Sequence, residues 1–471
     1  MTVLFMKKYF FFSFPLVFIL GTVQSCIVSK NYERPSLNEI NNLYRTDQLP
    51  KDSISMASLS WKQLFTDPYL SGYIEEGLLH NLDVRIALQQ IVAADALVKQ
   101  GKAGYLPSLT TRGTLTHLEL ARNSQFGSFF SGALDQYEFS GVLSWEADIW
   151  GKIRSTKRAA QANYLHQVAS HQAIKTQLIA QITISYYQLL ALDEQARITR
   201  ETIENRIKSL ETIKALKEAG NVNQVAVDQT AAQLYNAQAL LIDIEKNIFW
   251  SENLLSILLG KPSQEIERST LEEQQLNPEL SLGFSALLLR NRPDVIAAEY
   301  NLVNAFELTN VAESSFYPSF TFSATSGFQS LGFDQWFSSG SIFSTLVGGI
   351  TQPIFNRRQI RTQYEQAKTQ QQQSLLNFQK TLLTAGKEVS DALFEFDAES
   401  RKFEFRQKEV AALRQAEVHS EVLLNNGFGT YLDLLTARQN ALNAELNVVD
   451  NKLQQLQSIV TLYRALGGGW Q

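Results

Sequence analysis

The sequence repeats itself over a long range, and this repeat limits the possible folds more than any other feature. Four pairs of segments match between the two halves: Asn81–Val84 with Arg292–Val295, Tyr105–Ser108 with Phe316–Ser319, Gly220 with Gly427, and Gly260 with Gly467. The first two pairs are offset by 211 residues and the last two by 207, so 40 residues separate the two glycines in each copy. Independent loops would not keep this spacing. We therefore interpret the chain as a tandem duplication with a drift of four residues.

Each copy contains two very long stretches that are almost free of glycine and proline. In chain order they are Lys152–Ala219, Val222–Leu259, Arg357–Asn426 and Thr430–Leu466, interrupted only by Gly386. They are rich in strong helix formers. As a helix, the 68 residues of the first stretch would extend for about 100 Å. Glycine-containing turns separate the members of each pair, which predicts two long helical hairpins. A soluble coiled coil is the alternative reading of such a composition.

A shorter helix and two strands are expected before each hairpin. The helices are predicted over Pro68–Lys102 and Asp294–Phe316, each followed by a proline that cannot continue it. Alternation of apolar and polar residues predicts strands over Ser108–Thr116, Phe139–Ile149, Ser319–Thr325 and Ile342–Ile350. In the last of these, Phe343 and Val347 fall on the face opposite Ile342, Leu346 and Ile350. Each strand pair encloses a predicted loop, Ala121–Gln136 or Gln329–Gly340.

The four strands fit either a membrane sheet or a soluble sheet packed on helices. Their length is close to that of tilted strands that span a bilayer, and aromatic residues lie near their ends. These aromatic residues are Trp145, Trp150, Phe316, Tyr317, Trp336 and Phe337. An open sheet edge cannot remain in lipid, and four strands are too few to close a barrel. The membrane interpretation therefore requires several protomers to share one barrel.

The N-terminus is typical of an exported lipoprotein. Lys7 and Lys8 precede an apolar run too short to span a bilayer, so residues 1–25 are predicted to be a cleaved signal peptide rather than an anchor. The sequence Val23-Gln24-Ser25-Cys26 resembles a bacterial lipobox, which predicts lipid attachment at Cys26; an incidental thiol is the alternative. Because the next residue, Ile27, is not aspartate, the sorting rule for such lipoproteins directs the protein to the outer membrane.

Composition and motifs exclude several classes of function. The formal net charge is −5, which argues against nucleic acid as a partner. The only cysteine is Cys26, so no intramolecular disulfide is possible. None of the five histidines forms a zinc-ligating pair, and no phosphate-binding loop occurs. We therefore expect neither an enzyme nor a protein with a metal or a cofactor.

The ordered motifs resemble those of TolC-like outer-membrane factors, in particular the efflux lipoprotein branch of the NodT type. The matching segments are Tyr32–Pro35, Trp61–Pro68, Trp145–Lys152, Arg292–Val295, Phe316–Ser319, Gln352–Arg357 and Tyr431–Leu435. The resemblance implies a mixed, mainly α fold. Long hairpins would form a periplasmic α-barrel, and each protomer of a homotrimer would give four strands to one shared transmembrane β-barrel. Residues near Asp193–Arg197, Lys261–Leu282 and Lys30–Trp61 would form a belt around the α-barrel.

The resemblance also implies a function as the passive outer-membrane duct of a tripartite efflux system for small toxic compounds. Its partners would be a periplasmic membrane-fusion adaptor, an inner-membrane pump of the RND type and outer-membrane lipid. A type I protein-secretion duct is one alternative, and a non-conducting coiled-coil lipoprotein is another. The predicted organisation is a signal peptide (1–25), an anchored linker and belt segment (26–67), and two structural repeats (68–282 and 283–471).

A periplasmic gate is expected just beyond the hairpin turns, whose tips would contact the adaptor. The tip residues are Gly220, Asn221, Gly427 and Gly429. Leu432 matches an apolar gate position, but Thr436 stands where the family places an aspartate. Asp228 and Asp433 are the candidates to replace that acid, with Arg438 as a partner, although both aspartates fit equally well as solvated charges on the outer face.

The lipid attachment can be tested directly. Replacing the thiol in Cys26→Ser should abolish incorporation of a fatty-acid analogue, because no other cysteine is present to accept an acyl chain. Labelling is measured on the protein purified from cells grown with the analogue. Persistent labelling of the variant would show that Cys26 is not the attachment site.

Overall fold

The computed structural model describes residues 29–35, 60–129, 132–274 and 292–470 of the 471-residue chain. The predicted signal peptide, Cys26 and most of the predicted segment 26–67 lie outside this range. The described chain forms two compact units. Among the described residues, unit 1 comprises residues 29–35, 91–129, 132–166 and 298–378, and unit 2 comprises residues 60–90, 167–274, 292–297 and 379–470. Each unit takes segments from both copies of the repeat.

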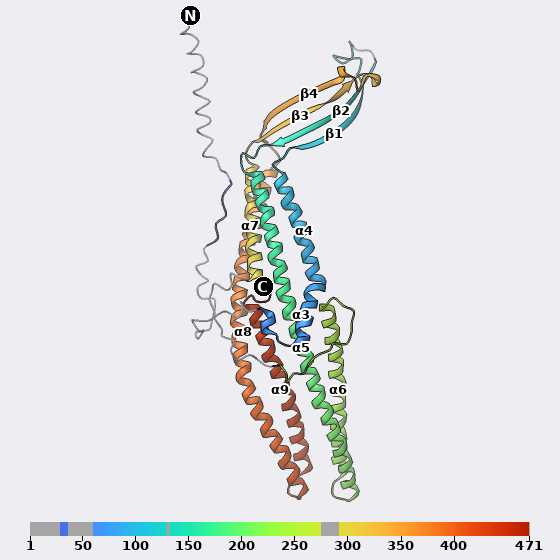
Figure 1. Ribbon diagram of the computed structural model, residues 1–471, viewed down its shortest axis with the longest axis vertical. Coiled ribbons are helices and arrows are strands. Elements are labelled where there is room, and N and C mark those ends of the chain that lie inside the picture. The colour runs from blue at the N-terminus through green and yellow to red at the C-terminus, as the bar shows by residue number, and fades with distance from the viewer. Residues whose placement is uncertain (1–28, 36–59, 130–131, 275–291, 471) are drawn as a thin grey trace. The chain divides into compact units, whose positions relative to one another are not determined.

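Unit 1 contains one four-stranded antiparallel sheet, drawn in Figure 1, with strand order β1-β2-β3-β4. The strands are β1 (Ser108–Glu119), β2 (Ala133–Glu146), β3 (Ser319–Ser330) and β4 (Ile342–Thr351). All four predicted strands are present. The predicted limits of the second strand are wrong at both ends. β2 begins inside the predicted loop because Asp135 and its neighbours pair with β1, and it ends at Glu146, before the predicted end at Ile149.

The register separates the side chains into an apolar face and a polar face. Cross-strand partners lie on the same face of a sheet. Starting from the pairs Leu109–Leu143 and Phe139–Phe328, one face carries the apolar residues Leu109, Leu115, Tyr137, Phe139, Leu143, Trp145, Phe322, Phe328, Ile342, Leu346 and Ile350. The other face consists mainly of serine and threonine, with Phe343 and Val347 among them, as the sequence pattern indicated. The sheet therefore has one face suited to lipid.

The strands connect directly to helices, and two features fix these junctions in unit 1. Asp148 accepts hydrogen bonds from the backbone amides of Ile153 (2.9 Å) and Arg154 (3.0 Å), which caps helix α5 (Lys152–Glu218). The indole of Trp150 donates to the carbonyl of Pro318 at 2.7 Å and stacks on Tyr317. The ends of β2 and β3 are thereby held together where the chain leaves the sheet.

The first described segment, residues 29–35, also packs within unit 1. The side chain of Asn310 in helix α7 (Pro293–Ser314) donates to the carbonyl of Lys30 at 3.0 Å. The guanidinium of Arg34 pairs with Glu299 at 2.7 Å. The predicted belt includes this segment, whose observed contacts through Lys30 and Arg34 are with α7. Residues 36–59 of that belt prediction lie outside the described range.

Unit 2 contains the free ends of two helical hairpins of matching size (Figure 1). The hairpins are α5 with α6 (Gln224–Leu258), and α8 (Gln359–Asn425) with α9 (Tyr431–Ala465). The outgoing helices have 67 residues each and the returning helices 35 each. Gly220 and Gly427 end the outgoing helices with φ of 76° and 75°, a left-handed conformation that favours glycine. Gly386 lies inside α8 without breaking it.

Shorter helices precede α5, and the single helix predicted over Pro68–Lys102 is wrong. The chain forms α2 (Trp61–Leu64), α3 (Pro68–His80) and α4 (Leu82–Ala103). The break falls at Asn81, whose side chain accepts hydrogen bonds from the amides of Asp83 and Val84 and so caps α4. No helix within the described part of the chain is both long enough and apolar enough to cross a membrane.

A buried carboxylate joins three parts of unit 2. Asp67 caps α3, and its second oxygen accepts hydrogen bonds from Tyr186 (2.9 Å), Gln274 (2.7 Å) and Ser269. Burial works to raise the pKa of Asp67, but these hydrogen bonds outweigh it, and the pKa lies below its usual value. Nearby, Arg268 pairs with Asp193, so the predicted belt segments around Asp193 and Lys261 do meet where they are described.

Asp67→Asn should destabilise unit 2 by about 2 kcal/mol at neutral pH, because it removes a charged acceptor of several hydrogen bonds. A lowered carboxyl pKa contributes stability above the pKa of the unfolded chain and loses it as the pH falls through the folded-state value. The difference from wild type should therefore shrink in acid. The midpoint of thermal loss of helical circular dichroism measures it. Glu75→Gln, which breaks only the exposed pair with Lys62, is the control. Equal midpoints for wild type and Asp67→Asn at neutral pH would contradict this role.

Candidate gate at the ends of the helical hairpins

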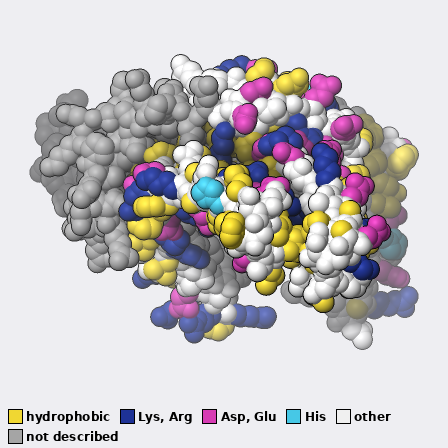
Figure 2. Space-filling view, turned by 90° about the horizontal axis from the view of Figure 1, so that it is seen from below, with side chains coloured by type: hydrophobic (Ala, Val, Ile, Leu, Met, Phe, Trp, Pro, Cys, Tyr) yellow, Lys and Arg dark blue, Asp and Glu magenta, His cyan; other side chains and the backbone are white. Residues whose placement is uncertain are grey.

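A groove of about 830 Å³ lies between the two hairpins of unit 2, near their turns. α5 lines it on one side, and α8 and α9 line it on the other. In Figure 2, which views the molecule from below, acidic and basic side chains are interspersed with hydrophobic ones on this end. The contacts that cross this groove therefore decide how easily one hairpin can move against the other.

Three polar contacts connect the first hairpin to the second across this region. The hydroxyls of Thr230 and Tyr431 lie 2.6 Å apart. Arg438 donates to the hydroxyl of Ser209 at 2.6 Å. Arg206 donates to the side-chain oxygen of Gln439 at 2.9 Å. We refer to these three contacts together as the inter-hairpin links.

Arg206 is the most unusual of the linking residues because its charge is buried. Only 5% of Arg206 is exposed, and it also donates to the backbone carbonyl of Gln233 in α6. Among the described residues no carboxylate forms an ion pair with it. Burial lowers the pKa of Arg206. A buried guanidinium that relies on a carbonyl and an amide for its hydrogen bonds is sensitive to any separation of the helices that supply them.

An ion-pair network lines the α8 and α9 side of the groove. Arg414 pairs with Glu417 at 3.2 Å and also with Glu445. Arg438 pairs with Glu417 at 3.4 Å and with Glu421 at 3.5 Å. Burial raises the pKa of Glu445, and the neighbouring Arg414 opposes this shift. The network therefore ties α9 to α8 within the second hairpin, while Arg438 extends it to α5.

The aspartates proposed from the sequence are used locally. Asp433 and Thr430 form a capping box at the start of α9, in which each side chain bonds the other residue's backbone amide. The Thr430 hydroxyl also donates to the Asp433 carboxylate at 2.6 Å, and this bond together with the one from the Thr430 amide lowers the pKa of Asp433. Asp228 accepts from Gln224 of its own helix at 2.8 Å. Arg438 pairs with glutamates of α8 rather than with either aspartate, because those glutamates face it across the hairpin.

The remaining predicted positions lie at the turns or just beyond them. Leu432 is exposed, and the hydroxyl of Thr436 donates to the carbonyl of Leu432 at 2.8 Å, an intrahelical bond that uses up its donor. Among the predicted tip residues, Asn221, Gly427 and Gly429 line the groove. Gly220 lies in the turn of the first hairpin.

Sequence reasoning missed the three inter-hairpin links. Tyr431 belongs to a motif that the resemblance used, but its hydroxyl partner Thr230 is 201 residues away and carries no pattern of its own. Arg206 is one of many charged residues on a long polar helix. The offset of 207 residues does place Asn223 and Thr430 in matching positions, and both cap their helices. The repeat could therefore predict these two helix caps, but not the contacts between the hairpins.

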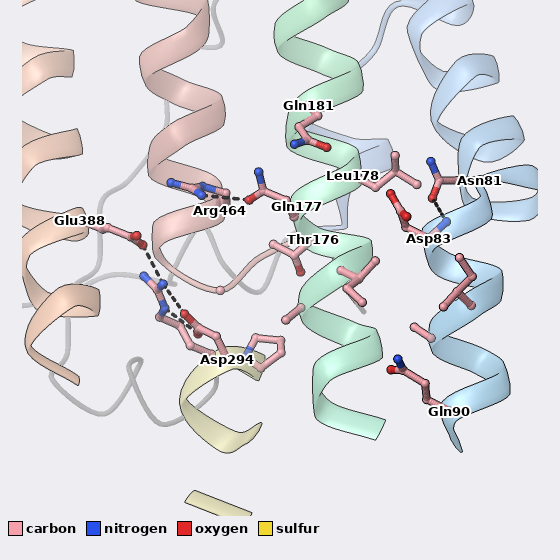
Figure 3. Close-up of a pocket in the computed structure, with 17 residues that line it drawn as sticks. Asn81, Asp83, Gln90, Thr176, Gln177, Leu178, Gln181, Asp294, Glu388 and Arg464 are labelled. Atoms are coloured by element: carbon pink, nitrogen blue, oxygen red, sulfur yellow. Dashed lines mark hydrogen bonds and ion pairs between the residues drawn. The ribbon is translucent and has the colours of Figure 1, made fainter. Parts of the chain in front are cut away.

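A second polar pocket, of about 560 Å³, lies elsewhere in unit 2 (Figure 3). Arg292 pairs there with Asp294 and Glu388, each at 2.7 Å, and donates to the carbonyl of Ala465 at 2.8 Å. The matching residue of the first copy, Asn81, donates to Leu258, the match of Ala465, at 3.0 Å. Each copy therefore docks the end of its returning helix on the start of its own repeat. The polar groups of the pocket are paired with one another, and we assign the pocket a structural role in holding the returning helices in place.

Comparison with known proteins agrees with this architecture. Residues 73–261 and 285–468 match the family described as outer membrane efflux protein. The probable efflux pump outer membrane protein TtgC of Pseudomonas putida is 28% identical over 421 residues, covering 88% of this chain and 86% of TtgC. The probable outer membrane lipoprotein SilC of Salmonella typhimurium is 28% identical over 475 residues, covering 97% of this chain and 98% of SilC.

A solved structure shows the same fold. The outer-membrane channel OprN is 24% identical and superposes with a TM-score of 0.86, covering 94% of this chain and 100% of that chain. Fold and relatives together define an outer-membrane transport protein. The chain belongs to the outer membrane efflux protein family. The predicted resemblance to TolC-like outer-membrane factors, the mainly helical fold with four antiparallel strands, and the outer-membrane location are thereby confirmed.

Arg206→Met should loosen the hairpin ends without unfolding the chain. It removes charge-assisted hydrogen bonds worth about 1.5–3 kcal/mol, so amide exchange in the first turns of α9 should accelerate by about tenfold or more. Mass spectrometry of deuterium uptake measures this change. Arg200→Met, which removes only an exposed pair with Glu245, is the matched control. Equal exchange in both variants would show that Arg206 does not link the hairpins.

Proposed function

We propose that this protein is the exit duct of a tripartite efflux system and works as a homotrimer. The observation that carries this proposal is the pairing of the sheet. Within the described residues, β1 and β4 each pair on one side only, so both edges of the sheet are open. The apolar face runs across all four strands up to those edges. A sheet of this kind is stable in lipid only if its edges are paired by neighbouring copies.

Three copies would supply twelve strands, which makes a barrel wide enough to enclose a water-filled passage. The serine- and threonine-rich face would line that passage, with Arg112, Glu138 and Glu146 as its charged residues. The apolar face would contact lipid. The long hairpins would extend the passage through the periplasm, where a membrane-fusion adaptor and an RND-type inner-membrane pump would supply substrate and energy. The duct itself would be passive.

Small toxic compounds are the substrate class that we assign to this system. The relatives TtgC and SilC, which align along most of the chain, are an efflux pump component and an outer-membrane lipoprotein by name. That combination supports the efflux branch over a duct for exported proteins. Selectivity in a passive duct would come from its bore, its lining charge and its gate.

The inter-hairpin links would hold the periplasmic end closed. Separation of the hairpins breaks the bonds of Tyr431, Arg206 and Arg438, whereas it leaves the capping box of Asp433 intact. The second possibility is the gate expected from the sequence, in which an acidic ring at Asp228 or Asp433 closes the duct. Binding of an adaptor at the hairpin tips, which include Gly220 and Gly427, would favour whichever arrangement opens the duct.

We infer that Cys26 carries the lipid anchor predicted from the lipobox. Ser29, the first described residue, is buried against Gly151, which follows the end of β2. Acyl chains on Cys26 would add anchoring to the membrane, with buried methylenes contributing about 0.8 kcal/mol each.

Planar-bilayer conductance of the purified protein tests the proposed function. A duct gives channels, and a non-conducting tether gives none. Tyr431→Phe and Arg206→Met should raise the closed-state current, because each removes an inter-hairpin link. Asp228→Ala, whose carboxylate contacts only its own helix among the described residues, should not raise it. Absence of channels under all conditions would refute the duct, and unchanged current in both link variants would refute the links as the gate.

The acidic-ring alternative has its own pair of variants. If a ring at Asp433 closes the duct, Asp433→Ala should raise the closed-state current and Thr430→Ala should not, because the second variant removes the cap but keeps the carboxylate. If only helix capping matters at this position, both variants should behave alike. The comparison uses the same bilayer measurement.

A further inference from the structure

The connection between β3 and β4 places an aromatic cluster on the apolar face of the sheet. The cluster consists of Tyr137, Phe139, Phe328, Phe333, Trp336 and Phe337. The first three belong to β2 and β3 and lie on the apolar face by their register. The last three belong to the connection, whose two short 3₁₀ turns bend it back. The connection therefore folds outward onto the apolar face of the sheet.

Ring contacts fix this fold-back on both strands. The rings of Phe333 and Trp336 each lie 5.5 Å from the ring of Tyr137. The ring of Phe337 stacks on Trp336 at 4.9 Å and lies 5.4 Å from Phe328. Even so, Phe333 remains 70% exposed and Phe337 64% exposed. Two large rings of the cluster are thus largely exposed beside the apolar face.

The position of the cluster along the strands matches the far boundary of a membrane. Tyr137 and Trp145 lie on the same face of β2, eight residues apart. At about 3.4 Å per residue this is about 27 Å along the strand, or about 20 Å of height at a tilt of about 40°. The apolar band of an outer-membrane barrel is about 25 Å tall, with aromatic girdles at both borders. Trp145, next to the helical junctions, and the cluster around Trp336 mark the two borders.

We propose that the β3–β4 connection is a membrane-contact element that inserts Phe333, Trp336 and Phe337 into the outer leaflet at the level between acyl chains and headgroups. The proposal rests on the proposed function, because it requires the apolar face to contact lipid. Continuity with that face, the height of the cluster and the exposure of two of its rings indicate lipid as the occupant. Tryptophan is enriched at this depth, and the phenylalanine rings beside Trp336 add apolar surface. The connection would also be kept away from the mouth of the duct.

Tryptophan fluorescence in lipid vesicles tests the depth of Trp336. Wild type, Trp336→Phe and Trp145→Phe are reconstituted in phosphatidylcholine vesicles whose acyl chains are brominated near the glycerol end, or left unbrominated. Bromine quenches only the indoles that it touches. We expect each substitution to reduce, by a similar amount, the part of the tryptophan fluorescence that bromine quenches in wild type. If Trp145→Phe reduces it and Trp336→Phe does not, the proposal fails while the membrane position of the sheet stands. If neither does, the proposed function fails with it.

A second pair of variants separates the role of the connection from a general effect on folding. Phe333→Ser with Phe337→Ser keeps Trp336 but removes the exposed rings beside it, so quenching of Trp336 by bromine should be lost and quenching by aqueous acrylamide should rise. Phe126→Ser with Phe129→Ser changes two exposed rings of the β1–β2 connection that have no ring contact among the described residues. That control should leave Trp336 unchanged. Equal behaviour of both pairs would overturn the proposal.

Discussion

The edges of β1 and β4, unpaired within the described part of the chain, are the constraint on which the rest of this protein depends. Lipid offers no hydrogen-bond partner to a backbone amide or carbonyl, so each open edge would leave a row of unsatisfied groups. Pairing with further copies removes that cost, but only if every copy presents its sheet in the same register and orientation. The four strands are each joined at one end to a helix through a short connection. Contacts such as the cap by Asp148 and the bond from Trp150 to Pro318 make those connections rigid. The helices would thereby fix the angle at which the edges meet those of neighbouring copies.

Duplication explains how one chain makes two similar hairpins. Later divergence explains why the two copies differ in strand length and in the residues that dock their returning helices. The hairpin helices keep an offset of 207 residues at every boundary, whereas β1 and β3 begin 211 residues apart. The four-residue drift therefore arose within the strand region, where strand and connection lengths differ between the copies. At the docking point of the returning helix, the neutral Asn81 of one copy is replaced by the charged Arg292 of the other. The geometry is conserved between the copies while its chemistry differs.

The sequence predicted those elements whose signal is local and missed those that depend on a distant partner. Helix formers without glycine or proline, ended by Gly220 and Gly427, gave hairpins with limits close to the observed ones. Alternation located all four strands, but it could not show that Asp135 pairs with His117 and so extends β2 into the predicted loop. The single helix predicted over Pro68–Lys102 failed because Asn81 is an ordinary helix-neutral residue until its side chain caps the next helix. For the gate, sequence pattern drew attention to Asp433. The links made by Arg206 and Thr230 depend on helix packing that no short-range pattern reports.

The strength of the inter-hairpin links is suited to a gate that a partner opens. A hydrogen bond between neutral hydroxyls, such as that of Thr230 with Tyr431, contributes about 1 kcal/mol, and bonds from a guanidinium contribute about 1.5–3 kcal/mol each. The three links together therefore amount to about 4–7 kcal/mol per protomer before any coupling between them. Shifting a two-state equilibrium from 1:99 to 99:1 requires about 5.5 kcal/mol of differential binding. A closed state of this stability resists spontaneous opening, yet lies within the range that adaptor binding at the hairpin tips can reverse. Tyr431 also packs against the apolar residues Ile213, Ala226 and Val227 of the first hairpin, so separating the hairpins would lose this contact as well. Polar links at the hairpin ends are thus consistent with opening on demand.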